Sequence, residues 1–202
     1  MQTNTFPGCL GQLQWTIGGA LHELTFDGPF TCNVDQRVSK IHDLICEIYA
    51  DIGTKNRIAS FTLGMFNNPG RFACLSSKAA EARDLVPVMA RLCRKVHNGS
   101  TRDEHRCRVF ELLEEIYDVF SLAGLVLSDL EHRTVVEAYD TFLLHYNALL
   151  RISLANGYRN YNWVFKTHHC YHIMELSNFL NPLVIWCYEF EAHVPFGQCN
   201  QK

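Results

Sequence analysis

The stretch SDLEHRTVVEAYDTFLLHYNALLRISLANG, residues 128–157, decides the fold because it predicts one long helix. Ser128 and Glu131 match the capping-box pattern, in which each side chain accepts a hydrogen bond from the other residue's backbone N–H. Gly157 stands where a residue in the left-handed conformation ends such a helix. We therefore expect a helix over residues 129–156. Its aromatic side chains Tyr139, Phe142 and Tyr146 are best explained as core, and so are Trp163 and Trp186 further along the chain.

Similar signals predict four further helices. Apolar residues recur at helical spacing between turn or capping residues in the ranges 33–52, 76–97, 101–124 and 165–180. Ser76 or Ser77 can cap the second of these, and Pro87 should kink it because proline removes a backbone donor. Thr101 and Glu104 form a second capping-box pattern. Residues 58–66 fit either a short strand or another helical turn.

The first 30 residues look different, because glycine and proline are frequent there: Pro7, Gly8, Gly11, Gly18, Gly19, Gly28 and Pro29. This composition is typical of turns and predicts an irregular lead-in or a short hairpin over residues 1–30. The remaining residues, 31–202, contain no linker or repeat. The expected fold is mainly α, a single-domain bundle of about five helices.

Composition limits the class of protein. The chain has 202 residues, of which 48% are hydrophobic and 19% charged, enough to bury a core. Its apolar runs are too short to cross a bilayer, so no membrane partner is expected. No secretory signal is visible, which favours an intracellular location, nuclear or cytoplasmic. The nine cysteines include no CxxC pair and are expected to be reduced, mostly buried thiols.

The overall charge gives little attraction to nucleic acid, since the net charge is −3. Any DNA contact must be local. One stretch gathers cations: Lys78, Arg83, Arg91, Arg94, Lys95, Arg102, Arg106 and Arg108. A solvated helix face is the simpler interpretation of this stretch, and a local DNA contact is the alternative.

The C-terminal quarter concentrates histidine, cysteine and glutamate. His168 and His172 are four positions apart, so they share one face of a helix and could bind one metal ion. Cys187 and His193 could complete a tetrahedral Zn²⁺ site, whereas core histidines bonded to a carbonyl or carboxylate are the simpler explanation. Glu191 follows an apolar stretch and could bind Mg²⁺, but two-metal chemistry needs further acids.

Several segments occur in an order that resembles a known family. LSSKAAEARDLVPVMARL, FLLHYNALL, KTHHCYH and LNPLVIWCYEFEAH follow one another across residues 72–197. The series looks like the C-terminal half of large DDE transposases of the CACTA and Plavaka-like type. It also resembles an uncharacterised multi-copy protein family of dinoflagellate genomes. The chain has Asn181-Pro182 where the transposases favour Gly-Pro.

The resemblance implies an RNase H-like parent with Mg²⁺-dependent DNA strand transfer as its activity. Glu191 would then be the last catalytic, metal-binding acid, supported by Lys166, His168, His172 and Trp186. The strands that carry the two earlier aspartates are not recognisable here. Because two Mg²⁺ ions need all three acids, the chain by itself is expected to be inactive.

Three functions therefore stay open. The first is a transposon-derived protein with DNA as its partner. The second is a non-catalytic helical interaction module that binds a protein partner or a second copy of itself. The third is a small zinc-binding helical protein. Mg²⁺ is the cofactor of the first and Zn²⁺ that of the third.

Overall fold

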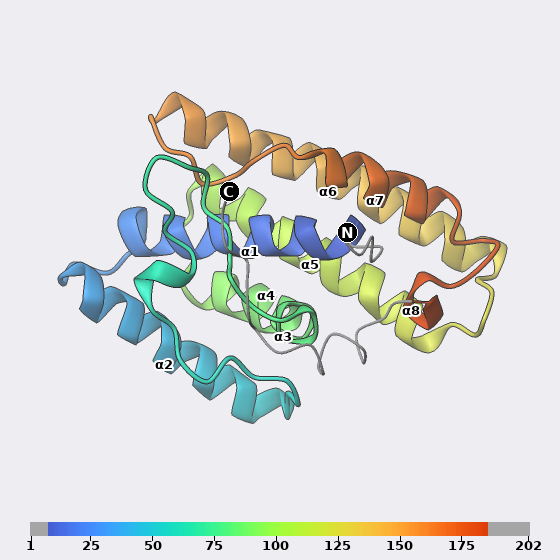
Figure 1. The fold of residues 1–202 in the computed structure, drawn as a ribbon, viewed down its shortest axis with the longest axis horizontal. Helices are drawn as coiled ribbons and strands as arrows, with labels where there is room; N and C mark the ends of the chain where they lie inside the picture. Colours follow the sequence, from blue (N-terminus) through green and yellow to red (C-terminus); the bar gives the residue numbers. More distant parts are fainter. Residues whose placement is uncertain (1–7, 186–202) are drawn as a thin grey trace, which may run out of the picture.

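The computed structural model describes residues 8–185 and shows, for this part of the chain, helices and no strand (Figure 1). The elements are α1 (Gly8–Asp27), α2 (Val34–Ile52), a 3₁₀ turn η1 (Leu63–Met65), α3 (Ala79–Asp84), α4 (Val86–Lys95), α5 (Thr101–Leu122), α6 (Asp129–Ala155), α7 (Phe165–Glu175) and α8 (Pro182–Ile185). The mainly α class is confirmed. The helices exceed the expected five, because the N-terminal region is helical, one predicted helix is divided and the short α8 follows the last predicted helix.

Helix α6 begins as predicted. The Ser128 hydroxyl accepts a hydrogen bond from the Glu131 backbone N–H at 3.3 Å, and the Glu131 carboxylate accepts one from the Ser128 N–H at 2.7 Å. Gly157 follows the helix with φ of 77°. Three of the predicted core aromatics are confirmed, because successive rings of the helix stack at 5.3 and 5.5 Å and are buried: Tyr139, Phe142 and Tyr146. The prediction is wrong for Trp163, which is 52% exposed, and Trp186 lies outside the described residues.

The predicted irregular lead-in is wrong, because residues 8–27 form helix α1. This helix lies between the others in Figure 1 and carries buried core residues on several turns: Leu13, Ile17, Leu21 and Leu24. Its glycines serve close packing. A Cβ at Gly18 would lie 2.5 Å from the Leu75 backbone nitrogen, and one at Gly19 would lie 2.3 Å from the Asn160 carbonyl oxygen. Gly18 and Gly19 therefore allow the close approach of other segments and do not mark turns.

Two helix starts differ from the prediction. The expected single helix over residues 76–97 is divided into α3 and α4 at Leu85, with Pro87 in the first turn of α4, where its missing N–H costs least. Helix α3 starts after Lys78, whose N–H donates to the Glu81 carboxylate at 2.9 Å. Helix α5 is capped one residue earlier than predicted, by Ser100.

Helix α7 is also shorter than predicted, because it ends at Glu175 instead of continuing to residue 180. Asn181 holds the following turn in place. Its side-chain amide donates to the Phe120 carbonyl at 2.8 Å and to the Gly124 carbonyl at 3.0 Å. Its own N–H donates to Leu125 O at 2.8 Å. Asparagine at this position therefore ties residues 176–185 to the end of α5.

The thiols described by the structure are free, and three of them are buried: Cys93, Cys107 and Cys170. Burial raises the pKa of Cys93 to about 12, which keeps it an inert neutral thiol. Cys46 is exposed, so the expectation of buried thiols holds only in part. Within residues 8–185, no helix is both long and apolar enough to cross a bilayer.

Candidate functional site

Half of the predicted site cannot be located. Trp186, Cys187, Glu191 and His193 lie outside the described residues, so the Mg²⁺ and four-ligand Zn²⁺ predictions stay untested. The other predicted residues are on α7: Lys166, His168 and His172. Within the described part of the chain, no group of three or more His, Cys, Asp or Glu side chains is placed to hold a metal ion.

The two histidines share an exposed face of α7, as their spacing predicted. The Nε2 atoms of His168 and His172 are 3.0 Å apart, and the rings meet edge to face. The other ring nitrogen of His172, Nδ1, lies 3.0 Å from the Glu175 carboxylate. His172 is about half exposed, so these rings are not core histidines. We call this trio, His168, His172 and Glu175, the histidine face.

Lys166 lies apart from the histidine face. Its side chain crosses α1 at Gly11, where an added Cβ would lie 2.3 Å from the lysine Cδ. The residue next to it on the buried side, Thr167, bonds to Gln12 of α1, and the Tyr139 hydroxyl donates to its carbonyl at 3.1 Å. Helix α7 is therefore fixed to α1 and α6 by its buried side, which leaves the histidine face toward solvent.

Nothing in the sequence indicated a deeply buried ionic group that the described residues form. Glu23 of α1 and Asp103 of α5 both accept hydrogen bonds from the Arg106 guanidinium, and the three side chains are each about 2% exposed. The Tyr161 hydroxyl donates to Glu23 at 3.1 Å, and Arg102 lies 3.6 Å from the same carboxylate. We call these five residues the buried ionic cluster.

Burial and pairing act in opposite directions on the acids of this cluster. Burial is the largest influence on Glu23 and raises its pKa, against the attraction of Arg106 and Arg102. Burial would also raise the pKa of Asp103, but Arg106 and hydrogen bonds from Asn98 and Ser100 outweigh it and lower that pKa. Because Glu23 is only 1% exposed, the cluster is closed to substrates. We assign it a structural role.

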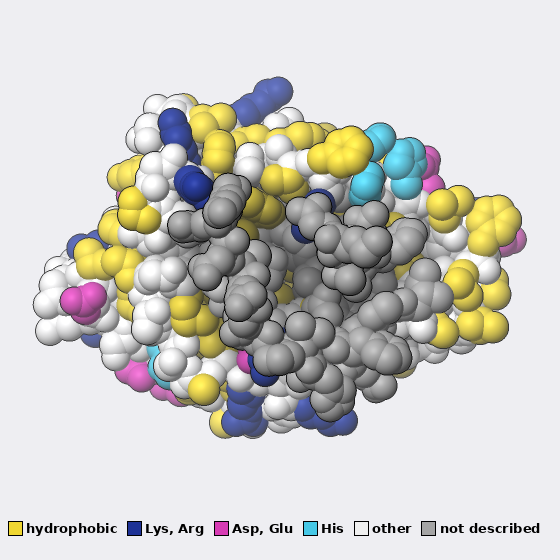
Figure 2. All heavy atoms as spheres, in the orientation of Figure 1, with side chains coloured by type: hydrophobic (Ala, Val, Ile, Leu, Met, Phe, Trp, Pro, Cys, Tyr) yellow, Lys and Arg dark blue, Asp and Glu magenta, His cyan; other side chains and the backbone are white. Residues whose placement is uncertain are grey.

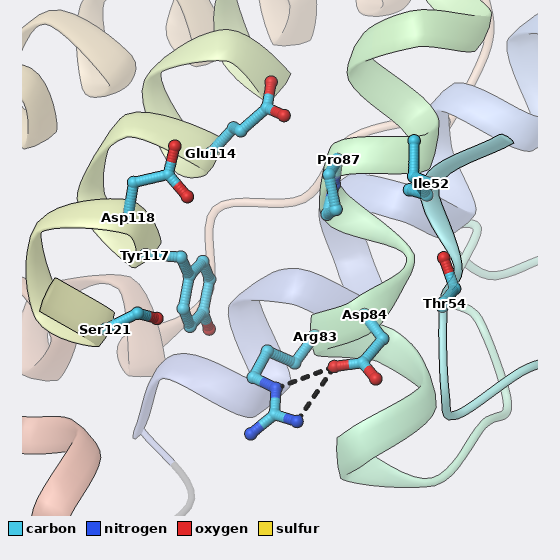
Figure 3. Close-up of a pocket in the computed structure, with 9 residues that line it drawn as sticks. All are labelled: Ile52, Thr54, Arg83, Asp84, Pro87, Glu114, Tyr117, Asp118 and Ser121. Atoms are coloured by element: carbon cyan, nitrogen blue, oxygen red, sulfur yellow. Dashed lines mark hydrogen bonds and ion pairs between the residues drawn. The ribbon is translucent and has the colours of Figure 1, made fainter. Parts of the chain in front are cut away.

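Two open clefts flank α5. The first, about 250 Å³, is lined by Ile52, Thr54, Arg83, Asp84, Pro87, Glu114, Tyr117, Asp118 and Ser121 (Figure 3). Figure 3 shows Glu114 and Asp118 projecting from α5 on one side of the cleft. On the other side, Arg83 and its neighbour Asp84 form an ion pair at 2.9 Å. The walls carry three carboxylates and one guanidinium, which is paired with Asp84, so the charge of this cleft is net negative.

The second cleft, about 470 Å³, lies between α5 and α6 and has acidic walls. It is lined by Glu111, Glu114, Glu115, Asp118, Val119, Leu122, Glu131 and Thr134. Arg94 pairs with Glu111 at 2.8 Å, and Arg108 approaches the same glutamate at 3.5 Å. We call this cleft the α5–α6 groove. Five carboxylates around two apolar residues favour a ligand that is both cationic and apolar.

The groove opens at Leu122 onto a group of exposed hydrophobic side chains. They come from the end of α5, the following loop, the start of α6 and the segment after α7: Leu122, Leu125, Val126, Leu130, Leu176, Phe179 and Val184. Figure 2 shows hydrophobic side chains gathered at this end of the molecule. Leu122 is 87% exposed and Phe179 73%. We call this set the apolar end surface; no sequence signal predicted it.

Comparison with known proteins gives no relative. No family model matches the chain, and the searches of curated proteins and of solved structures found no match. The resemblance to DDE transposases therefore stays a prediction that rests on the order of the sequence motifs.

Proposed function

We propose that this chain is a non-catalytic helical interaction module that binds a basic amphipathic segment of another protein. The apolar end surface carries the proposal. Each of its side chains is more than half exposed, although such residues are normally buried or scattered. A group of this kind at one end of a helical domain is typical of a protein-binding surface.

The adjoining α5–α6 groove indicates the charge of the partner. Burial raises the pKa of Glu114, and the neighbouring carboxylate of Asp118 adds to this rise, against the opposing effect of Arg94. A further cation in the groove would relieve this repulsion. Lysine or arginine side chains that flank apolar anchors would therefore match the groove and the apolar end surface together.

Two candidate ligands from this same chain, its own C-terminal segment and a second copy, match the acidic groove less well. The segment 186–202 has aromatic residues, but its charged groups are Glu189, Glu191 and a single lysine at the end, which do not complement acidic walls. The densest group of cations that a second copy could offer is the basic stretch. Six of those eight already form ion pairs within their own chain: Arg83, Arg94, Lys95, Arg102, Arg106 and Arg108. A different protein is the better-matched partner.

The same ion pairs weaken the case for DNA. Phosphate binding needs clustered cations that are free to replace counterions, and here most of the cluster is neutralised inside the fold. The groove beside it is lined by carboxylates, which repel phosphate. Both observations favour the interaction module over a DNA-binding protein.

The test uses a fluorescent model helix built of lysine and leucine, with a matched helix of glutamate and leucine. We expect the basic helix to bind with an affinity that falls as salt is added, and the acidic helix to bind more weakly. Leu122→Asp and Phe179→Asp should each weaken binding by about tenfold or more, since both put a charge on the contact surface.

Leu144→Asp is the matched control. Leu144 is 72% exposed on α6 but outside the apolar end surface, so its replacement should leave binding unchanged. Equal binding of the acidic and basic helices, or an equal loss with Leu144→Asp, would refute the proposal. Sedimentation provides a second check. A dimer that Leu122→Asp dissociates would assign the surface to a second copy of this chain and exclude the proposed partner.

The transposon-derived origin remains a second proposal, supported by the ordered motifs that include Lys166, His168 and His172. It makes a separate prediction, namely that the isolated chain does not nick DNA because it lacks the earlier acids. Mg²⁺- or Mn²⁺-dependent nicking that Glu191→Gln abolishes would show an active enzyme and overturn this prediction. A salt-sensitive DNA shift would favour this origin over the module.

A further inference from the structure

The geometry points to a two-histidine chelate for a divalent transition metal, preferably Cu²⁺ or Ni²⁺, on the histidine face of α7. This site uses only residues of the described chain, and it differs from the four-ligand Zn²⁺ site expected from the sequence. Its ligands are the Nε2 atoms of His168 and His172, with water at the remaining positions. It is independent of the proposed partner surface.

The separation of the two nitrogens supports this assignment. They lie 3.0 Å apart, close enough for one metal ion with bonds of about 2.0–2.1 Å to bridge them. Protein zinc sites normally use three or four side-chain ligands, whereas Cu²⁺ and Ni²⁺ suit tetragonal sites with nitrogen and oxygen ligands, here two imidazoles and water. Imidazole ligands also bind Cu²⁺ most strongly among the common divalent metals. The face therefore fits copper and nickel better than zinc.

The hydrogen bonds of the face prepare one ligand. The Glu175 carboxylate accepts a hydrogen bond at 3.0 Å, so Nδ1 of His172 carries the proton and its Nε2 keeps a free lone pair. In the metal-free protein, this lone pair accepts from Nε2–H of His168. On metal binding, Nε2 of His168 loses its proton to water and Nδ1 takes one from water, so the ring becomes the Nδ1–H tautomer and stays neutral.

Glu175 is a positioning residue in this scheme. Carboxylates that bind the far nitrogen of a metal-bound imidazole fix the ring's orientation and raise its basicity. His169, on the same helix, has no place in the site, because its ring packs against Phe165 with centroids 4.5 Å apart. It provides a matched control.

Two other pairs of possible metal-binding side chains lie close together. His105 and His145 bring their Nδ1 atoms within 2.8 Å, but the pair is partly buried and lies near the positive charge of Arg108. The sulfur of Cys46 lies 3.4 Å from His42 Nε2 on α2. Neither pair has a carboxylate on its outer nitrogen in the described structure, but both could bind metal weakly, so the test must separate them.

The test is titration of the untagged chain with Ni²⁺, which does not oxidise thiols as Cu²⁺ does, in a Cys46→Ser background. Calorimetry should show one ion per chain, bound more tightly than Zn²⁺. His168→Gln and His172→Gln should each raise the Kd by about tenfold or more, because either change destroys the chelate. Glu175→Gln should raise it by less than the roughly 10–100-fold typical of buried supporting carboxylates, since this one is exposed.

Paramagnetic broadening gives a second readout. Bound Ni²⁺ should broaden the imidazole proton signals that disappear in the His168 and His172 variants, and His169→Gln and His145→Gln should leave the Kd unchanged. An effect of His169→Gln or His145→Gln equal to that of His168→Gln would overturn the assignment. An equal loss with Cys187→Ser or His193→Gln would replace the two-histidine chelate by a larger site.

Discussion

The buried ionic cluster and the histidine face place polar residues in opposite environments. Glu23, Asp103 and Arg106 are each about 2% exposed and completely surrounded, whereas His172 and Glu175 are about half exposed. In the first region, desolvation makes every pairing essential to the fold. In the second, water can replace any lost contact, so the groups are available to bind a ligand. Clustering in sequence therefore pointed to the exposed histidines, but it gave no sign of the buried charges, which come from segments far apart in the chain.

The largest effect should come from removing the central cation. Arg106→Met leaves two buried carboxylates without their partner and should destabilise the protein by about 3–5 kcal/mol or prevent folding. Urea unfolding followed by circular dichroism measures this. Adding Glu23→Gln and Asp103→Asn to Arg106→Met should recover part of the loss, since no buried charge is then unpaired. A loss below about 1 kcal/mol would mean that the cluster contributes no more to stability than a surface ion pair.

Asp103 gives a pH-dependent version of the same comparison. Its pKa is lowered in the folded state, so its contribution is fully present above the unfolded pKa of about 3.9 and is lost as the pH falls through the folded pKa. Asp103→Asn should cost about 1.5–3 kcal/mol at neutral pH, and the difference from the wild type should shrink on acidification. Unfolding curves across acidic pH measure this difference.

The control for this experiment is Asp140→Asn, on an exposed position of α6. It should change stability by less than about 0.5 kcal/mol at every pH. Glu23 acts with the opposite sign, because its raised pKa favours folding as the pH falls. A difference between Asp103→Asn and wild type that grows on acidification would contradict the assigned pKa direction.

Asn181 should show a smaller effect. Asn181→Ala leaves the carbonyls of Phe120 and Gly124 without their side-chain donor and should cost about 1–3 kcal/mol. Thermal or urea unfolding measures the loss. Asn178→Ala, an exposed asparagine three positions earlier, is the control and should stay within about 0.5 kcal/mol. Equal stability of the two variants would mean that water replaces the amide.

The smallest effect should come from the histidine face. His172→Gln removes a half-exposed ring that helps no buried group, so stability should change by less than about 0.5 kcal/mol in the absence of metal. The same variant should lose Ni²⁺ binding, which separates a ligand-binding role from a structural one. A loss above about 1 kcal/mol would mean that the face stabilises α7 directly.

Several features could be predicted because they depend on residues close in sequence. The capping pair Ser128 and Glu131 and the shared face of His168 and His172 follow from helix geometry alone. The prediction was wrong for α1, since the glycines that suggested turns meet Cys74, Leu75 and Asn160 from distant segments. Only the packed structure shows why these positions carry no side chain.

The sequence alone determined that the described chain is mainly helical, where α2, α6 and α7 begin and that two histidines share a face. These properties depend on neighbours within a few residues. The tertiary structure decided which polar groups are buried and which apolar groups are exposed. Glu23 and Arg106 are 83 positions apart, so they meet only because α1 and α5 pack together. Leu122 and Phe179 are exposed because they lie at the end of α5 and after the end of α7, where no other described segment covers them.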